Sequence, residues 1–200
     1  MAADQESAAD HDPLEERVVT SEVVYRGKYM VFHVDTIERP DGSRGTRDLV
    51  AHPGAVAVLA VDDDGRVLLV RQWRVAAGRA LLEIPAGTLD VLDGVTEDPD
   101  AAARRELEEE TGYRAASWRK LAEFWTAPGF ASELMHLYLA TGLAAVADAT
   151  RLSPDDDEEL ELRHVKVDEA LGLVDTGAIA DAKSILGLLW LDRLRSTGLY

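Results

Sequence analysis

The chain has 200 residues, 46% of them hydrophobic, and its 38 acidic and 21 basic side chains give a formal net charge of −17. This length fits one domain of ordinary size, and the charge argues against a nucleic-acid backbone or an anionic membrane as the main partner. The chain has no Cys, no apolar run of the roughly 18 residues that a spanning helix needs and no secretory signal, so we expect a soluble cytoplasmic protein without disulfides or thiolate metal sites.

The N-terminal part begins with a polar, acidic, Ala-rich stretch, which is typical of disorder. Alternating apolar residues at 21–25 and 29–38 then predict an antiparallel strand pair that ends at the turn Pro40-Asp41-Gly42. A further strand is predicted at 46–52. The expected division is a disordered tail at 1–17, N-terminal strands at 18–50 and a main domain at 51–200.

The main domain opens with a nearly continuous apolar run at 55–61, as expected for a central buried strand, and residues 67–73 return as its hairpin partner. Either Asp98 or Asp100 can cap the helix that follows. Further strands are predicted at 81–84, 118–125, 133–140 and 162–167, and helices at about 99–111, 168–176 and 181–195. This order predicts a mixed α/β domain.

The first of these helices carries Glu106, Glu109 and Glu110, whose spacings of three and four residues place them on one face. Like charges on one face repel each other, and a hard cation such as Mg²⁺ or Mn²⁺ relieves that repulsion. The turn Pro85-Ala86-Gly87 before the helix and Gly112 after it frame a place where a backbone carbonyl and carboxylates can meet one ion. The alternative is an ordinary solvated acidic face.

A longer pattern surrounds this helix. Its residues are, in order, Gly87, Glu97, Arg105, Glu106, Leu107, Glu109, Glu110 and Gly112. The pattern resembles the box of the Nudix hydrolases, in which five residues separate the first glycine from the first glutamate. Nine residues separate Gly87 from Glu97 here, and Tyr113 replaces a small aliphatic residue. Either Asp93, at the strict spacing, or Glu97 therefore fills the first acidic position.

Segments outside the box are similar to the ADP-ribose pyrophosphatase branch of that family. They are Gly54-Ala55-Val56, Gln72-Trp73-Arg74, the stretch 82–87 and Ala127-Pro128-Gly129. In that branch a proline lies sixteen residues after the closing glycine, and Pro128 holds this place after Gly112. The resemblance implies a Nudix-type α/β/α sandwich with a mixed central sheet, plus the N-terminal antiparallel strand pair. It also implies Mg²⁺-dependent hydrolysis of ADP-ribose to AMP and ribose 5-phosphate.

The resemblance also implies roles for particular residues. The implied metal ligands are the carbonyl of Ala86 and the carboxylates of Glu106, Glu109, Glu110 and Glu158. The implied catalytic residues are Arg105, Glu109, Glu110, Asp156 and Glu158. Among these, Arg105 orients its neighbouring carboxylates, and Asp156, in the acidic loop at 155–159, is the proposed base. A surface ion pair for Arg105 and a solvated acidic loop are the alternatives.

Substrate contacts are expected from charged residues and from one loop. Arg47 and Arg74 suit phosphate and ribose because a guanidinium binds phosphate through two hydrogen bonds. Glu83 and Glu133 are expected to accept hydrogen bonds from ribose or adenine. Pro128 and Gly129 complete the set through the resemblance. For each of the charged residues, a surface salt bridge is the alternative.

The alternatives for function are a hydrolase of other nucleoside diphosphate sugars, such as GDP-mannose, or of oxidised nucleotides, and a non-catalytic sensor of ADP-ribose. The acidic helix face argues against a sensor, which has no need of mutually repelling carboxylates. The expected partner is a small nucleotide sugar, with neither nucleic acid nor membrane. Relatives in the branch commonly pair through swapped N-terminal strands, which implies a homodimer.

Overall fold

The structure, a computed structural model, describes residues 12–147, 149–150, 152 and 159–199 and divides the chain into two units. The first unit contains residues up to 52 together with residues 127–132. The second contains residues 53–126 and those from 133 onward.

The first unit is a three-stranded antiparallel sheet in the order β1-β2-β3. Its strands are β1 (Arg17–Arg26), β2 (Val31–Glu38) and β3 (Arg44–Ala51). The turn before β3 has Gly42 at φ 80°, and the Asp41 side chain accepts the Ser43 N–H at 2.9 Å. The predicted strand pair is confirmed, and the third predicted strand joins it along β2.

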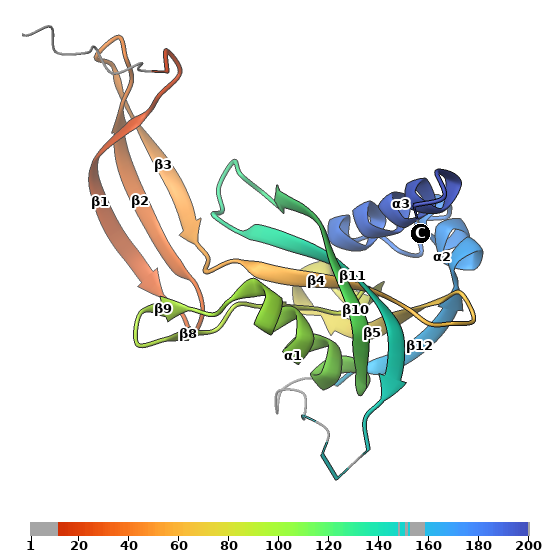
Figure 1. The fold of residues 1–200 in the computed structure, drawn as a ribbon. Helices are drawn as coiled ribbons and strands as arrows, with labels where there is room; N and C mark the ends of the chain where they lie inside the picture. The colour runs from red at the N-terminus through yellow and green to blue at the C-terminus, as the bar shows by residue number, and fades with distance from the viewer. Residues whose placement is uncertain (1–11, 148, 151, 153–158, 200) are drawn as a thin grey trace, which may run out of the picture. The chain divides into compact units, whose positions relative to one another are not determined.

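The second unit contains a seven-stranded mixed sheet with the path β10-β11-β4-β5-β12, in which β6 also pairs with β5 and β7 with β4 (Figure 1). Its strands are β4 (Ala55–Val61), β5 (Arg66–Arg74), β6 (Arg79–Glu83), β7 (Ala86–Thr88), β10 (Tyr113–Trp125), β11 (Leu134–Ala145) and β12 (Glu161–Lys166). Only β11 and β4 run parallel. Every residue of β4 is buried, as the apolar run predicts.

Helices cover both faces of this sheet, which confirms the predicted α/β/α sandwich (Figure 1). On one face, α1 (Pro99–Thr111) packs Ala102, Ala103 and Leu107 against alternate residues of β4. On the other, α2 (Val167–Asp175) and α3 (Ala182–Ser196) cover the remaining residues of β4. Burying one Leu such as Leu107 contributes about 1.5–3 kcal/mol, so α1 is held firmly on the sheet.

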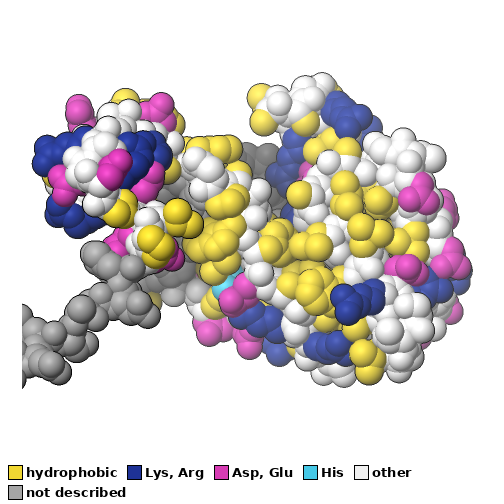
Figure 2. Space-filling model, turned by 90° about the horizontal axis from the view of Figure 1, so that it is seen from above, with side chains coloured by type: hydrophobic (Ala, Val, Ile, Leu, Met, Phe, Trp, Pro, Cys, Tyr) yellow, Lys and Arg dark blue, Asp and Glu magenta, His cyan; other side chains and the backbone are white. Residues whose placement is uncertain are grey.

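Shorter elements lie between the strands. They are the 3-10 helix η1 (Val75–Ala77) and the hairpin of β8 (Val91–Leu92) and β9 (Val95–Thr96). On the face seen in Figure 2, basic and acidic side chains are interspersed with hydrophobic ones. Within the described part of the chain, no helix is long and apolar enough to cross a membrane.

Candidate active site

Helix α1 has well-formed ends, which fix the orientation of its acidic face. Asp98 is the N-cap, and its Oδ1 accepts the N–H groups of Asp100 at 2.9 Å and Ala101 at 3.1 Å. Such a cap contributes about 1 kcal/mol. Of the two predicted candidates it is Asp98 that caps, whereas Asp100 lies inside the first turn and accepts the Tyr138 hydroxyl proton at 2.6 Å. Gly112 ends the helix in the left-handed conformation at φ 73°, as predicted.

Arg105 gathers several carboxylates around one guanidinium. Its Nη1 lies 2.8 Å from Glu106 Oε1 and 2.8 Å from Glu109 Oε2. Its Nε and Nη2 donate to Glu97 at 3.1 and 2.8 Å, and Asp90 lies 3.9 Å away. Hydrogen bonding to Glu97 and attraction by Glu106 raise the pKa of Arg105 above its usual range. These are the contacts that its predicted orienting role requires.

The extra residues of the box form the hairpin β8–β9 and leave Glu97 beside the helix. Asp93 lies in the hairpin turn at φ 52°, followed by Gly94 at φ 79°. A backbone hydrogen bond of 2.8 Å from Glu97 N–H to Asp90 O closes the base of the hairpin. Hydrogen bonds from Arg105 lower the pKa of Glu97. Of the two candidates for the first acidic position, the one in contact with Arg105 is thus Glu97.

The start of β7 touches the acidic face directly. The Ala86 N–H donates to Glu110 Oε2 at 3.0 Å, and the Pro85 carbonyl accepts the Val58 N–H at 2.8 Å. A Cβ atom added at Gly87 would lie 1.9 Å from Glu106 Oε1. A side chain at position 87 would therefore displace the Glu106 carboxylate from this place against the backbone.

The donor set fits a hard divalent cation. Glu106 and Glu110 are only 8% and 4% exposed, and a buried carboxylate needs a positive partner. Oxygen atoms from carboxylates and a carbonyl are the ligands that Mg²⁺ prefers. As placed, no three His, Asp or Glu side chains among the described residues converge closely enough to hold a metal. The predicted ligand Glu158 and the predicted base Asp156 lie outside the described residues.

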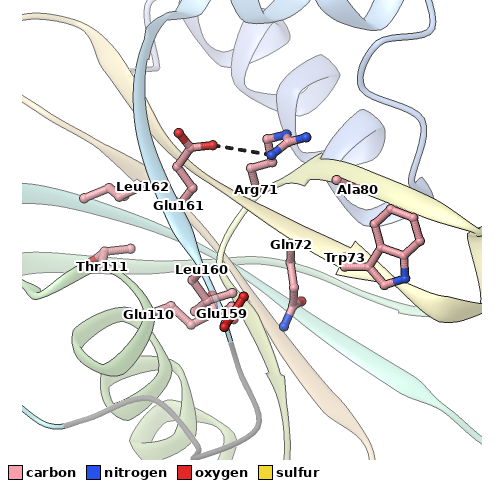
Figure 3. A pocket seen from close by; sticks show the side chains of 10 residues that line it. All are labelled: Arg71, Gln72, Trp73, Ala80, Glu110, Thr111, Glu159, Leu160, Glu161 and Leu162. Carbon is pink, nitrogen blue, oxygen red and sulfur yellow. Dashed lines mark ion pairs between the residues drawn. The ribbon is translucent and has the colours of Figure 1, made fainter.

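A cavity of about 730 Å³ opens beside the C-terminal end of α1 (Figure 3). Its lining residues are Arg71, Gln72, Trp73, Ala80, Glu110, Thr111 and residues 159–162. In its wall, an ion pair of 3.6 Å joins Arg71 of β5 to Glu161 at the paired position of β12. The predicted metal ligand Glu110 thus reaches a space that also contains a guanidinium and an indole ring.

The predicted substrate residues Arg74 and Glu83 form a pair. Arg74 donates from Nε to Glu83 Oε1 at 2.9 Å and from Nη2 to Oε2 at 2.8 Å. The carboxylate of Glu83, which is 1% exposed, also receives Lys183 Nζ. Burial raises the pKa of Glu83, but hydrogen bonds from Arg74 and the attraction of Lys183 outweigh this effect and keep the pKa below its usual range. Sequence reasoning missed Lys183.

The remaining predicted substrate residues are divided between the two units. Glu133 accepts the hydroxyl proton of Thr126. Arg47 pairs with Glu16, with 2.9 Å between Nε and Oε2. Arg47, Pro128 and Gly129 belong to the first unit, whereas Glu133 belongs to the second together with Arg74 and Glu83.

The sequence matches two known protein families. Residues 51–187 match the NUDIX domain, and residues 16–50 match the nucleoside diphosphate sugar hydrolase N-terminal domain. The chain therefore belongs to the Nudix family.

Three similar proteins cover most of the chain. An ADP-ribose pyrophosphatase of Bacillus subtilis (strain 168) is 41% identical over 178 residues, which are 89% of this chain and 93% of that protein. An ADP-ribose pyrophosphatase of Mycobacterium tuberculosis (strain ATCC 25618 / H37Rv) is 37% identical, covering 90% and 84%. A methanol dehydrogenase activator of Bacillus methanolicus is 39% identical, covering 88% and 92%.

A solved structure of an ADP compounds hydrolase superposes on this chain with a TM-score of 0.77 and covers 94% of this chain and 99% of that one. At 23% identity, this likeness shows the fold alone.

Proposed function

We propose that this protein hydrolyses the pyrophosphate bond of ADP-ribose, giving AMP and ribose 5-phosphate, with Mg²⁺ as the preferred cation and Mn²⁺ as a substitute. The observation that carries the proposal is the close approach of Glu106 to Gly87, which brings a buried carboxylate against the loop of Ala86. The names of the relatives support the choice of substrate, since two of the proteins described above are ADP-ribose pyrophosphatases.

Each group has a part in this reaction. A bound divalent cation offsets the charge of the diphosphate and makes a bound water more acidic. Glu106, Glu109, Glu110 and Glu158, with the Ala86 carbonyl, are the proposed ligands. Arg105 holds two of these carboxylates in place through its 2.8 Å contacts. Asp156 accepts a proton as the oxygen of water bonds to phosphorus and the bridging P–O bond breaks.

The substrate is held by the groups outside the metal site. The exposed part of the Arg74 guanidinium suits a phosphate oxygen. Arg47, Glu83, Glu133, Pro128 and Gly129 complete the proposed substrate contacts. We further propose a cytoplasmic homodimer that pairs through residues 18–50.

The test is incubation with ADP-ribose and Mg²⁺ in ¹⁸O-labelled water, followed by mass spectrometry of the products. We expect AMP and ribose 5-phosphate, one of them carrying the label. Glu110→Gln should lower kcat by about 100-fold or more, because loss of even an outer partner of a metal site costs 10–100-fold, while ADP-ribose still binds. Glu123→Gln is the control, since Glu123 pairs at the surface with Lys120. No turnover of any nucleoside diphosphate sugar with either cation would sink the proposal.

A second candidate substrate class is another nucleoside diphosphate sugar. The match of residues 16–50 to a nucleoside diphosphate sugar hydrolase N-terminal domain favours it, and a GDP-mannose pyrophosphatase of Cronobacter sakazakii (strain ATCC BAA-894) is 35% identical over 162 residues. A panel of ADP-ribose, GDP-mannose and related sugars ranked by kcat/KM decides between them, because discrimination is expressed in that ratio.

A further inference from the structure

The first turn of α3 is joined to the end of β6, which leads into the loop of Ala86. The buried hydroxyl of Ser184 accepts the Ile84 N–H at 2.8 Å. Asp181, the N-cap of α3, accepts the Ser184 N–H at 3.1 Å. A segment 100 residues away in sequence thus holds the strand that carries Glu83.

The same turn contributes a charge. Lys183 Nζ reaches Glu83 Oε2 and also lies 2.9 Å from Asp181 Oδ1. The Lys183 side chain is 13% exposed, whereas that of Arg74 is 38% exposed. One buried carboxylate therefore binds two cations, of which Arg74 is the more accessible to an anionic ligand.

We propose that Lys183 is a positioning residue for substrate binding, which acts through Glu83 on Arg74. This inference rests on the proposed function, because it takes a nucleoside diphosphate as the ligand of Arg74. Lys183 neutralises Glu83, so the carboxylate can orient the guanidinium without leaving an excess of negative charge beside it.

Charge counting supports this role. Arg74 and Lys183 balance Glu83 and Asp181, so the group of four has no net charge. Without Lys183 the group would carry one net negative charge next to the guanidinium that is to meet phosphate. Charges that are partly removed from water interact more strongly than charges at a surface, and the bidentate contact fixes the direction of the guanidinium. Without Lys183, the unbalanced negative charge would therefore repel the phosphate groups of the ligand.

The test measures binding of ADP-ribose by calorimetry with EDTA, so that no metal-dependent turnover interferes. For Lys183→Met we expect the Kd to rise about tenfold at low ionic strength, and less at high salt, because ions screen the unbalanced charge. Lys183→Arg keeps the charge and should stay within about threefold of the wild type. With Mg²⁺ present, KM should change more than kcat.

Two further variants separate positioning from folding. Ser184→Ala removes the hydrogen bond to Ile84 and leaves all four charges, so it should lower Tm while the Kd stays near that of the wild type. The double variant Asp181→Asn/Lys183→Met removes one charge of each sign and keeps the bidentate contact of Glu83 with Arg74. Its Kd should be lower than that of Lys183→Met alone, because the excess negative charge is gone.

The outcomes are distinct for the two proposals. Binding of ADP-ribose without turnover in Mg²⁺ would refute the proposed function but leave the role of Lys183 intact if its variants behave as expected. An unchanged Kd in folded Lys183→Met, an equal loss of affinity in Ser184→Ala, or a wild type that does not bind ADP-ribose would overturn the role of Lys183.

Discussion

Two clusters of charged side chains in the second unit differ in their numbers of positive and negative charges. Arg105 stands among four carboxylates, those of Asp90, Glu97, Glu106 and Glu109. Glu83 has the opposite surroundings, because it pairs with two cations, Arg74 and Lys183. Lys183 also pairs with Asp181, which belongs to the same group. Counted over these ion pairs of described residues, the first group has one guanidinium and four carboxylates, and the second has two cations and two carboxylates.

From this difference we expect the group around Arg105 to be stabilised by a bound cation and the group around Glu83 to be stabilised by its own ion pairs. Carboxylates held close together repel one another, and an oxygen-binding cation shared between them relieves that repulsion, so the group around Arg105 should gain stability from a divalent ion. The group around Glu83 should lose stability when any one of its members is removed, and should gain nothing directly from the metal. The following predictions test this contrast, starting with the largest effect.

Glu83→Gln should lower the free energy of unfolding by about 3–5 kcal/mol, because it removes the buried carboxylate that pairs with Arg74 and with the largely buried Lys183. Urea denaturation measures this quantity. The matched control is Glu123→Gln, whose half-exposed carboxylate contacts Lys120 and His136, and this change should cost under about 1 kcal/mol. Equal losses in the two variants would mean that the group around Glu83 is no more important to the fold than a surface pair.

Gly87→Ala should lower kcat by about 100-fold or more with little change in Tm, since its methyl group displaces the Glu106 carboxylate, a flexible group, and leaves the backbone in place. Gly172→Ala is the control, because nothing lies within 4 Å of its added methyl group. That change sits inside α2 and should be neutral or stabilising by roughly 0.5–1 kcal/mol. Full activity in Gly87→Ala would argue that the position of Glu106 is unimportant.

Mg²⁺ at about 100 times its Kd should stabilise the protein by about 2.7 kcal/mol, which corresponds to a Tm increase of roughly 5–10 °C for a chain of this length. Scanning calorimetry with and without EDTA measures the shift. Glu106→Gln should reduce it, and Glu123→Gln should keep it. A shift that survives in Glu106→Gln would place the ion elsewhere.

The smallest effect concerns pH. The folded-state pKa of Glu97 is lowered, so its contribution to stability is present above the unfolded value of about 4.3 and is lost as pH falls through the folded pKa. In EDTA, the stability difference between wild type and Glu97→Gln should therefore shrink as pH drops below about 4. Urea titrations at several pH values test this, and a difference that grows towards low pH would contradict it.

The sequence predicts much of the fold because the relevant signals are local. The cap, the proline and the closing glycine bound α1, and the apolar run at 55–61 identifies β4. The sequence analysis predicts strands at 118–125 and 133–140, whereas β10 begins at Tyr113 and β11 continues to Ala145 through Gly142 at φ 66°, although a glycine inside a strand weakens it. Yet residues 113–117 pair with 141–145, since long-range pairing overrides that local signal.

Within the candidate site, too, local sequence signals predict some residues and not others. Glu106, Glu109 and Glu110 follow from helical spacing, but spacing alone left Asp93 and Glu97 as equal candidates. The hairpin that distinguishes them depends on its own turn geometry. Lys183 carries no local signal at all, because its partner Glu83 lies 100 residues away. The contact between Lys183 and Glu83 depends on how α3 packs against the sheet.

The β8–β9 hairpin has a consequence for recognising related proteins. Its strands pair with each other, and the Glu97 to Asp90 hydrogen bond closes its base, so its length can vary without moving Glu97 away from Arg105. A search that demands a fixed interval between the glycine and the glutamate would overlook such chains. The turn at Asp93-Gly94 is also a natural place to insert a peptide tag or fluorophore, since added residues there extend a closed loop that projects from the domain.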